Sequence, residues 1–170
     1  MALSDTISST KVLLDCSATS HMFMYHKSFT NYTKSSNKFV TVSRRNWVPM
    51  AGWGSINFTA LLPNGHLSII LHNVLHIPHL GANLVSLGAL HRQGVSVRSL
   101  DNSLVLSKDS KELFQASLTN SAGALYYIQC APLASNTTYL AKNSGNIRLQ
   151  CHQHHHIEHS NPRAIDPKHC

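Results

Sequence analysis

The chain has 170 residues, 42% of them apolar, which is enough for one packed domain with a short tail. Its formal charge of +7 comes from a shortage of acidic residues, 7 against 14 basic ones, and the basic residues are scattered. This composition argues against a wholly disordered chain and against a strongly basic nucleic-acid-binding domain. At most it predicts a weak general attraction to polyanions.

The cysteines and the N-terminus indicate the cellular compartment. Cys16, Cys130, Cys151 and Cys170 form no CxxC pair, and the segment MALSDTISSTK lacks the basic and apolar regions of a secretory signal. No apolar run approaches the roughly 20 residues that a membrane helix needs. We therefore expect an intracellular protein, cytoplasmic or nuclear, that carries thiols and is neither secreted nor bound to a membrane.

Short β-type segments separated by turns dominate the first 130 residues. An apolar run ends at Asp15, and later segments rich in Val, Ile, Thr, Tyr and Phe alternate in part. Pro63-Asn64-Gly65 and Asp101-Asn102 have the residue types of hairpin turns. Besides the run before Asp15, the expected strands are 38–43, 55–62, 66–75, 95–100, 103–107 and 124–129.

One segment, NLVSLGALHRQG at 83–94, has a helical period, with Leu84, Leu87 and Leu90 near one face and Gly94 as a stop. Many short strands and one short helix are typical of a small all-β barrel or sandwich. The sequence therefore predicts an all-β fold.

The texture of the chain changes after this region and indicates its domain limits. A polar segment containing SNTTYLAKNSGN follows, and then CHQHHHIEHSNPRAIDPKHC, which has six histidines in twenty residues. The expected organisation is a flexible N-terminus (1–10), a β-barrel domain (11–130), a linker (131–150) and a His-rich segment (151–170).

Asp15 is the only carboxylate between Asp5 and Asp101, and it directly follows an apolar strand. Aspartic proteases place their catalytic group in such a position. Their chemistry needs two carboxylates that share one proton, since like charges about 3 Å apart cannot both ionise. One aspartate per chain then implies a symmetric homodimer. The alternative is an aspartate that begins an Asx-turn and has no catalytic role.

Four segments carry a resemblance to a known family. They are LLDCSATSHM (13–22), VPMAGWGSI (48–56), LHNVLHIPHLGANLVSLGAL (71–90) and LYYI (125–128). In order and spacing they resemble the protease region of copia-type LTR retrotransposon Gag-Pol polyproteins. The family pattern has an aliphatic-D-S-G-A-T-S-H-M box, a G-x-G segment, an N-V-L-x-x-P-x-L-x-x-N-L-x-S segment and a closing L-Y. The most diagnostic part is NVLHIPHLGANLVS at 73–86.

The resemblance implies a retropepsin-like β-barrel that acts as a homodimeric aspartic endopeptidase on its own polyprotein and needs no cofactor. Asp15 would be the catalytic aspartate, and Cys16 and Ser17 would complete the catalytic loop. The flap that covers the substrate would lie near Ala51, Gly52, Trp53 and Gly54. His21 and Met22 belong to the first box without an assigned role.

The catalytic loop departs from the family pattern at two positions. Cys16 stands where the family has serine, and a thiol is a weak hydrogen-bond partner for the brace between the two loops of the dimer. Ser17 stands where the family has glycine, and its side chain adds bulk close to the carboxylates. We therefore expect the barrel to fold and its proteolysis to be impaired or absent.

The His-rich segment resembles the start of the GAG-pre-integrase and integrase zinc module. His154 and His159 would be zinc ligands there, but the CxxC pair that completes the module is absent. Cys151 and Cys170 could supply sulfur ligands at an unusual spacing. The alternative is a flexible tail that binds metals adventitiously. Nucleic-acid binding would be expected through the integrase region, which this chain lacks.

Three functions remain open at this stage. The first is a retrotransposon-derived protease with impaired activity. The second is a non-enzymatic β-barrel, a relic or a co-opted module that dimerises or binds a partner. The third is a zinc- or nucleic-acid-binding fragment centred on the tail.

Overall fold

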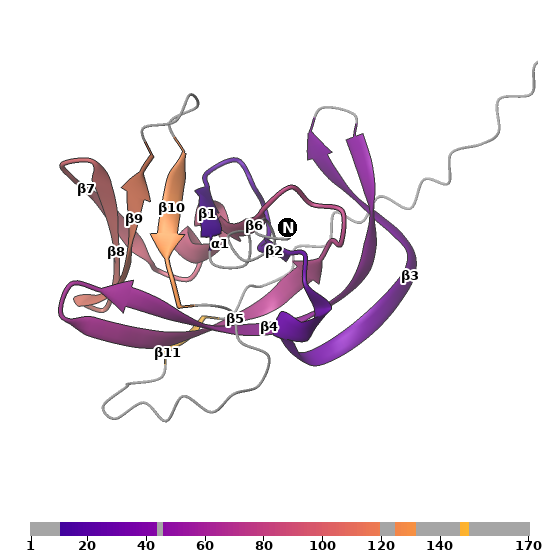
Figure 1. The fold of residues 1–170 in the computed structure, drawn as a ribbon, viewed down its shortest axis with the longest axis horizontal. Helices are drawn as coiled ribbons and strands as arrows, with labels where there is room; N and C mark the ends of the chain where they lie inside the picture. The colour runs from indigo at the N-terminus through magenta and orange to yellow at the C-terminus, as the bar shows by residue number, and fades with distance from the viewer. Residues whose placement is uncertain (1–10, 44–45, 120–124, 132–146, 150–170) are drawn as a thin grey trace, which may run out of the picture.

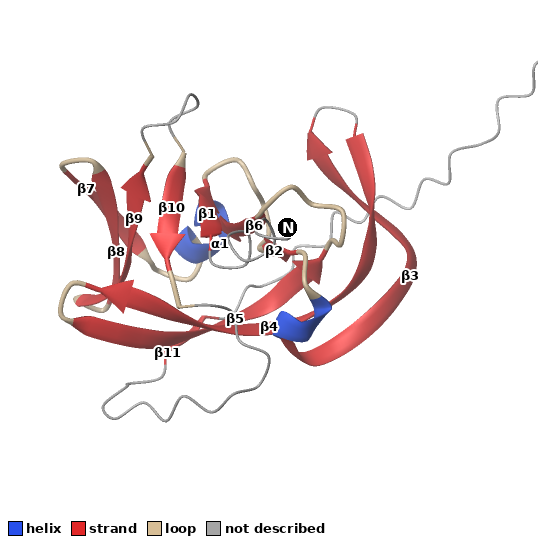
Figure 2. Cartoon of the chain, viewed as in Figure 1, coloured by secondary structure: helices blue, strands red, loops and turns tan. Residues whose placement is uncertain are grey.

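The computed structural model describes residues 11–43, 46–119, 125–131 and 147–149. Strands dominate the described chain (Figure 2), so the predicted all-β fold is confirmed. The expected flexible N-terminus at 1–10 and the His-rich segment at 151–170 lie outside the described residues. The elements in order are β1 (Lys11–Asp15), β2 (Met22–Phe23), the 3-10 turn η1 (His26–Ser28), β3 (Phe29–Ser43), β4 (Asn46–Leu62), β5 (Gly65–His76), β6 (Asn83–Ser86), α1 (Leu87–His91), β7 (Ser96–Leu100), β8 (Ser103–Lys108), β9 (Lys111–Leu118), β10 (Tyr126–Gln129) and β11 (Ile147–Leu149).

The strands form one sheet with the order β3-β4-β5-β2-β6-β1-β10-β9-β8-β7, and β11 pairs with β5. In Figure 1, β4 and β5 run along the base of the molecule, β7 to β10 stand over one end, and the outer part of the β3–β4 hairpin rises at the other. A bridge between Ala60 and Cys130 joins β4 to the residues after β10. The amide of Ala131 also donates to the carbonyl of Thr59 at 2.9 Å. The sheet therefore curls back on itself as a barrel.

The barrel encloses an apolar core to which nearly every strand contributes. Phe58 of β4 and Phe114 of β9 meet edge to face, with ring centroids 6.2 Å apart. A second, smaller cluster lies under the β3–β4 hairpin, where Met22, Met50 and Ile77 are buried. Burial of such side chains supplies most of the stabilisation of a domain of this size. The long strand β4 therefore packs against one apolar cluster near each of its ends.

Several predicted strands are confirmed with altered ends. The segments expected at 66–75, 95–100, 103–107 and 124–129 correspond to β5, β7, β8 and β10. Those expected at 38–43 and 55–62 are parts of the longer β3 and β4. Both predicted hairpin turns are present, because Leu62 pairs with Gly65 and Leu100 pairs with Ser103.

The predicted helix at 83–94 is wrong over its first turn. Residues Asn83–Ser86 form β6, which pairs in parallel with β1 and antiparallel with β2. The two neighbouring strands offer hydrogen bonds on both sides of this segment, and this long-range pairing overrides the local helical period. The helix begins at Leu87, because the Ser86 side chain accepts from the Ala89 amide and caps it.

Besides β6, three strands, β2, β9 and β11, have no counterpart among the expected ones. The strand β9 is paired with β8 and β10, and its buried side chains include Leu113 and Phe114. The turn before it is formed by Asp109 and Ser110, both at positive φ. The strand β11 pairs with Ile69–Leu71 of β5 inside the segment expected to be a linker.

Candidate functional site

Asp15 is the last residue of β1, directly beside the point where β6 passes into α1. Its register partner in the parallel strand β6 is Ser86. The loop after Asp15 runs to β2 and returns beside β6, where Met22 pairs with Leu84. Two of the segments that carry the family resemblance therefore lie against each other, although the paired residues are more than sixty positions apart in the sequence.

The carboxylate of Asp15 organises its own loop. Its Oδ1 accepts hydrogen bonds from the Ser17 amide at 2.8 Å, the Ser17 hydroxyl at 2.7 Å and the Ala18 amide at 3.2 Å. The first bond is that of an Asx-turn, so this alternative is present in the molecule. Within the described residues no hydrogen bond to the second oxygen, Oδ2, is observed. Asp15 is half-buried, and one oxygen is left for other chemistry.

The two residues that depart from the family pattern are both exposed. Cys16 is a thiol outside any disulfide, and Ser17 turns its hydroxyl back onto Asp15 rather than away from it. A glycine at position 17 could not make this bond. The substitution therefore changes the immediate surroundings of the carboxylate as well as the available space.

Hydrogen bonds from β6 and α1 hold the loop that follows Asp15. His21 is fully buried, and its Nδ1 accepts from the Ser86 amide at 3.0 Å. The Ser86 hydroxyl donates to the Ala18 carbonyl at 2.6 Å. Arg92, at the end of α1, donates from Nη2 to the Thr19 carbonyl at 2.8 Å. Burial, and secondarily the charge of Arg92, lowers the pKa of His21 to about 4.

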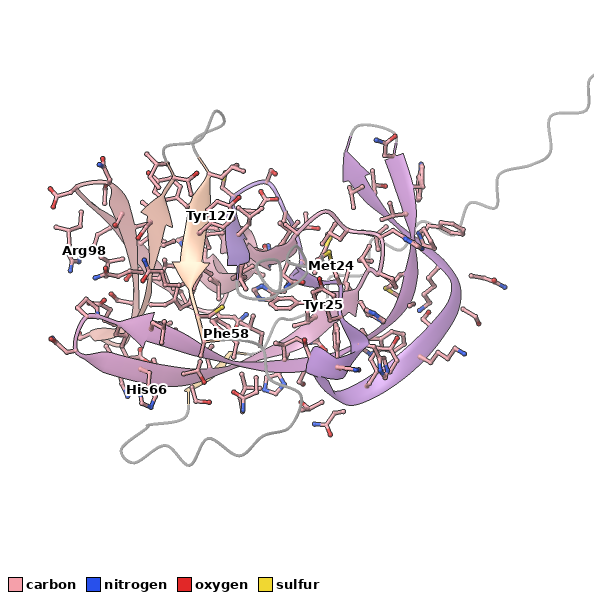
Figure 3. The ribbon with its side chains drawn as sticks, in the orientation of Figure 1. Met24, Tyr25, Phe58, His66, Arg98 and Tyr127 are labelled. Atoms are coloured by element: carbon pink, nitrogen blue, oxygen red, sulfur yellow. The ribbon has the colours of Figure 1, made fainter. Side chains whose placement is uncertain are left out.

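Asn83, at the start of β6, links the same two segments. It is fully buried, and its Oδ1 accepts from the Met24 amide at 3.0 Å. Met24 and Tyr25, labelled in Figure 3, follow β2 at this point. The sequence marked Asn83 and Ser86 as parts of a diagnostic segment but gave no sign that Ser86 bonds to the Asp15 loop or that Asn83 bonds to the residue after β2. Arg92 carried no signal at all.

The predicted flap residues Ala51, Gly52, Trp53 and Gly54 lie in the middle of β4. There Gly52 pairs with Lys34 of β3 and with His76 of β5. A Cβ on Gly52 would collide with the Thr33 carbonyl and the Tyr32 ring, and one on Gly54 would lie 2.9 Å from the Thr30 carbonyl. Both glycines are thus required by the close approach of β3. A role of this segment in covering substrate stays a prediction.

The close approach of β3 creates an aromatic cluster with a buried histidine, His76. Its Nδ1 is 2.8 Å from the Tyr32 hydroxyl and its Nε2 is 3.1 Å from the Met24 carbonyl. The Tyr32 hydroxyl therefore donates to Nδ1 while Nε2 carries the ring proton. The rings of His26 and Phe29 complete the cluster. Burial lowers the pKa of His76, and it raises that of Tyr32.

Sites for metals and small ligands are not evident in the described ranges. These ranges contain no group of three or more His, Cys, Asp or Glu side chains placed to hold a metal ion. The predicted zinc ligands His154 and His159 lie outside them. A cavity of about 150 Å³ is well below the size of a typical ligand pocket, and it does not reach Asp15. Its lining residues are Leu61, Leu62, Pro63, Gln115, Ser117 and Gln129.

Among the described residues, no helix has both the length and the apolar character needed to cross a membrane.

Comparison with known protein families identifies a match in the first part of the chain. Residues 12–95 match the family model of the Pol polyprotein beta-barrel domain. This range begins with β1, includes the whole Asp15 loop and ends just after α1. Neither the curated proteins nor the solved structures contain a match to the chain. The family match supports a retrotransposon Pol polyprotein as the origin of this β-barrel.

Proposed function

We propose that the barrel is one protomer of a retropepsin-type aspartic protease that derives from a copia-type Gag-Pol polyprotein and would cleave that polyprotein. The observation that carries the proposal is the position of Asp15. Asp15 is the last residue of a strand inside the region matched to the Pol β-barrel domain, and part-buried hydrogen bonds fix the loop that follows it.

The chemistry requires a second copy of the chain. One carboxylate must accept a proton from the attacking water while the other donates a proton to the substrate amide. Asp15 has no other described carboxylate near it in sequence, since the next acidic residue is Asp101. A two-fold axis beside the Asp15 loop would bring the two Asp15 side chains together. Oδ2, which has no described hydrogen bond, is the oxygen available to meet the partner and the water.

The surroundings of Asp15 argue for reduced activity. The Ser17 hydroxyl donates to Oδ1, which also accepts two amide protons. These three donors come from the loop of the same chain, so they occupy the oxygen that would otherwise be open to the second carboxylate and the water. In the family pattern a serine hydroxyl at this position would brace the two loops of a dimer. Cys16 has a thiol there instead, and a thiol forms weaker hydrogen bonds. Both substitutions act on the pairing of the two carboxylates and leave the barrel itself intact.

The same contacts favour a second candidate function, a non-enzymatic barrel retained as a relic or as a binding module. In that case the role of Asp15 is the Asx-turn that its Oδ1 already forms. The family match applies equally to this candidate. The two functions differ in what happens when the loop is restored to the family pattern.

Full-length chains with the natural loop, with Cys16→Ser and Ser17→Gly together, and with Asp15→Asn added to that pair separate the candidates. Each chain is incubated with a peptide library at acidic and neutral pH, with and without pepstatin. We expect the double variant to raise pepstatin-sensitive cleavage at least about tenfold, because proton transfer by a well-placed acid and base is worth at least that much. Asp15→Asn should abolish this gain. No cleavage by the double variant would overturn the protease proposal.

A further inference from the structure

Two fully buried polar residues beside the Asp15 loop, His21 and Ser86, take no part in the proposed chemistry. His21 lies in the same sequence box as Asp15, and Ser86 lies in the segment 73–86. Buried polar groups lower stability unless they form hydrogen bonds. Their presence at the back of this loop therefore calls for a specific reason.

The hydrogen bond of His21 fixes its protonation state. Its Nδ1 accepts from the Ser86 amide, so the ring proton of the neutral side chain must be on Nε2. Nε2 is buried and has no hydrogen-bond partner in the described part of the chain. An apolar side chain would avoid this unsatisfied group. The contribution of histidine at this position is therefore its acceptor, which an apolar residue cannot supply.

A chain of contacts leads from His21 to the carboxylate. The Ser86 hydroxyl donates to the Ala18 carbonyl, and the Ala18 amide in turn donates to Oδ1 of Asp15. At its other end, the His21 carbonyl accepts from the Leu75 amide of β5 at 2.9 Å. The loop is thus held on one side by β5 and on the other by the junction of β6 and α1.

We propose that His21 and Ser86 are positioning residues that set the orientation of the Asp15 carboxylate. His21 fixes the backbone of Ser86, and the Ser86 hydroxyl fixes Ala18, whose amide donates to Oδ1 of Asp15. Arg92 adds a third, exposed bond at the Thr19 carbonyl. The catalytic consequence rests on the proposed protease function. The orientation of the loop itself does not.

The structural test is amide hydrogen exchange measured by NMR on the full chain. His21→Leu places an apolar side chain at the buried position and removes the acceptor, whereas His21→Asn keeps an acceptor near the position of Nδ1. We expect the amides of Ser17, Ala18 and Ser86 to exchange at least about tenfold faster in His21→Leu than in His21→Asn. The amides of Leu106 and Phe114, in the distant strands β8 and β9, report the stability of the core. Their exchange rates should be equal in the two variants.

A second variant covers the case in which His21→Leu does not fold. Ser86→Ala removes the bond to the Ala18 carbonyl and the cap on the Ala89 amide, but it keeps the backbone amide that donates to His21. It should speed exchange at Ala18 and leave Leu106 unchanged. Equal exchange at Ala18 in the natural and Ser86→Ala chains would overturn the proposal. So would faster exchange that extends equally to Leu106 and Phe114, because it would mark a general stabilising role.

The catalytic test uses the Cys16→Ser, Ser17→Gly background. His21→Leu should lower kcat at least about tenfold with little change in KM, because small misplacement of a catalytic group has effects of that size or larger. His21→Asn should restore kcat. An unchanged kcat in His21→Leu would overturn the catalytic part. If the background chain has no activity, the protease proposal fails, and the exchange experiment still decides whether His21 and Ser86 position the loop.

Discussion

The Asp15 loop and the Gly52–Gly54 segment of β4 both resemble family motifs, but different physical causes explain their residues. The first is held by two buried polar side chains, His21 and Ser86, each of which bonds to a backbone group far away in the sequence. In the second, Gly52 and Gly54 lack side chains because β3 passes too close for a Cβ. A motif of glycines is thus explained by packing alone. A motif of buried polar groups around a carboxylate is not, and function is better sought there.

This contrast bears on the predicted flap. Gly52 takes part in hydrogen-bonded pairing on both sides, with β3 and with β5, so its segment is held in the interior of the sheet. A movable cover needs backbone that can leave its partners at low cost. Close packing against β3 therefore explains the two glycines without a flap.

The largest expected effect concerns the polar region and its pH dependence. The unfolded chain binds a proton at His21 with a pKa near 6.5, whereas the folded chain does so only near 4, so acid favours unfolding between these values. At about 1.4 kcal/mol per pH unit, the free energy of unfolding should fall by about 3 kcal/mol over this window. Urea unfolding at pH values from above 6.5 down to about 4 measures the loss.

The matched control for this prediction is His21→Asn, which does not titrate. His76, whose pKa is also lowered, contributes in the same direction in both chains and cancels from the difference. The contribution of His21 is present above pH 6.5 and is lost as the pH falls toward 4. Parallel pH profiles for the two chains would show that His21 is not buried as a neutral acceptor.

A smaller effect tests the glycine region. Gly52→Ala should lower the free energy of unfolding by about 2 kcal/mol, because overpacking against backbone atoms forces neighbouring strands apart. Gly81→Ala is the control, since nothing lies within 4 Å of the added Cβ and the change there should be under about 0.5 kcal/mol. Equal stabilities in urea for the two variants would remove the packing explanation and return weight to a functional role for the segment.

The sequence predicted those features that depend on local chemistry. The turns at Pro63-Asn64-Gly65 and Asp101-Asn102 are specified by a few adjacent residues, and both are present. The segment Asn83–Ser86 was mispredicted because Leu84 has a helical spacing to the leucines that follow it, while the partners of the segment, β1 and β2, are about sixty residues away or more. The strand β9 was missed because KELFQASL mixes residues that favour strands with residues that favour helices. Its pairing with β8 and β10 makes it a strand.

The candidate site shows the same division. Asp15 could be predicted because an aspartate after an apolar strand, within a family box, is visible in the sequence. The contribution of Ser86 could not, since the bond between Ser86 and His21 spans 65 residues and depends on burial. Arg92 is exposed and reaches the Thr19 carbonyl across 73 residues, so no local pattern reveals it.

The most direct test of the central claim, that two copies of Asp15 form one catalytic site, is a mixing experiment. Cleavage by the Cys16→Ser, Ser17→Gly chain is measured after equilibration with an equal amount of the same chain carrying Asp15→Asn, and compared with the first chain alone. If mixed dimers hold a single useful carboxylate, random pairing should lower the rate to about half. Cleavage that is unaffected by the Asp15→Asn chain, or no cleavage by the first chain, would contradict the account.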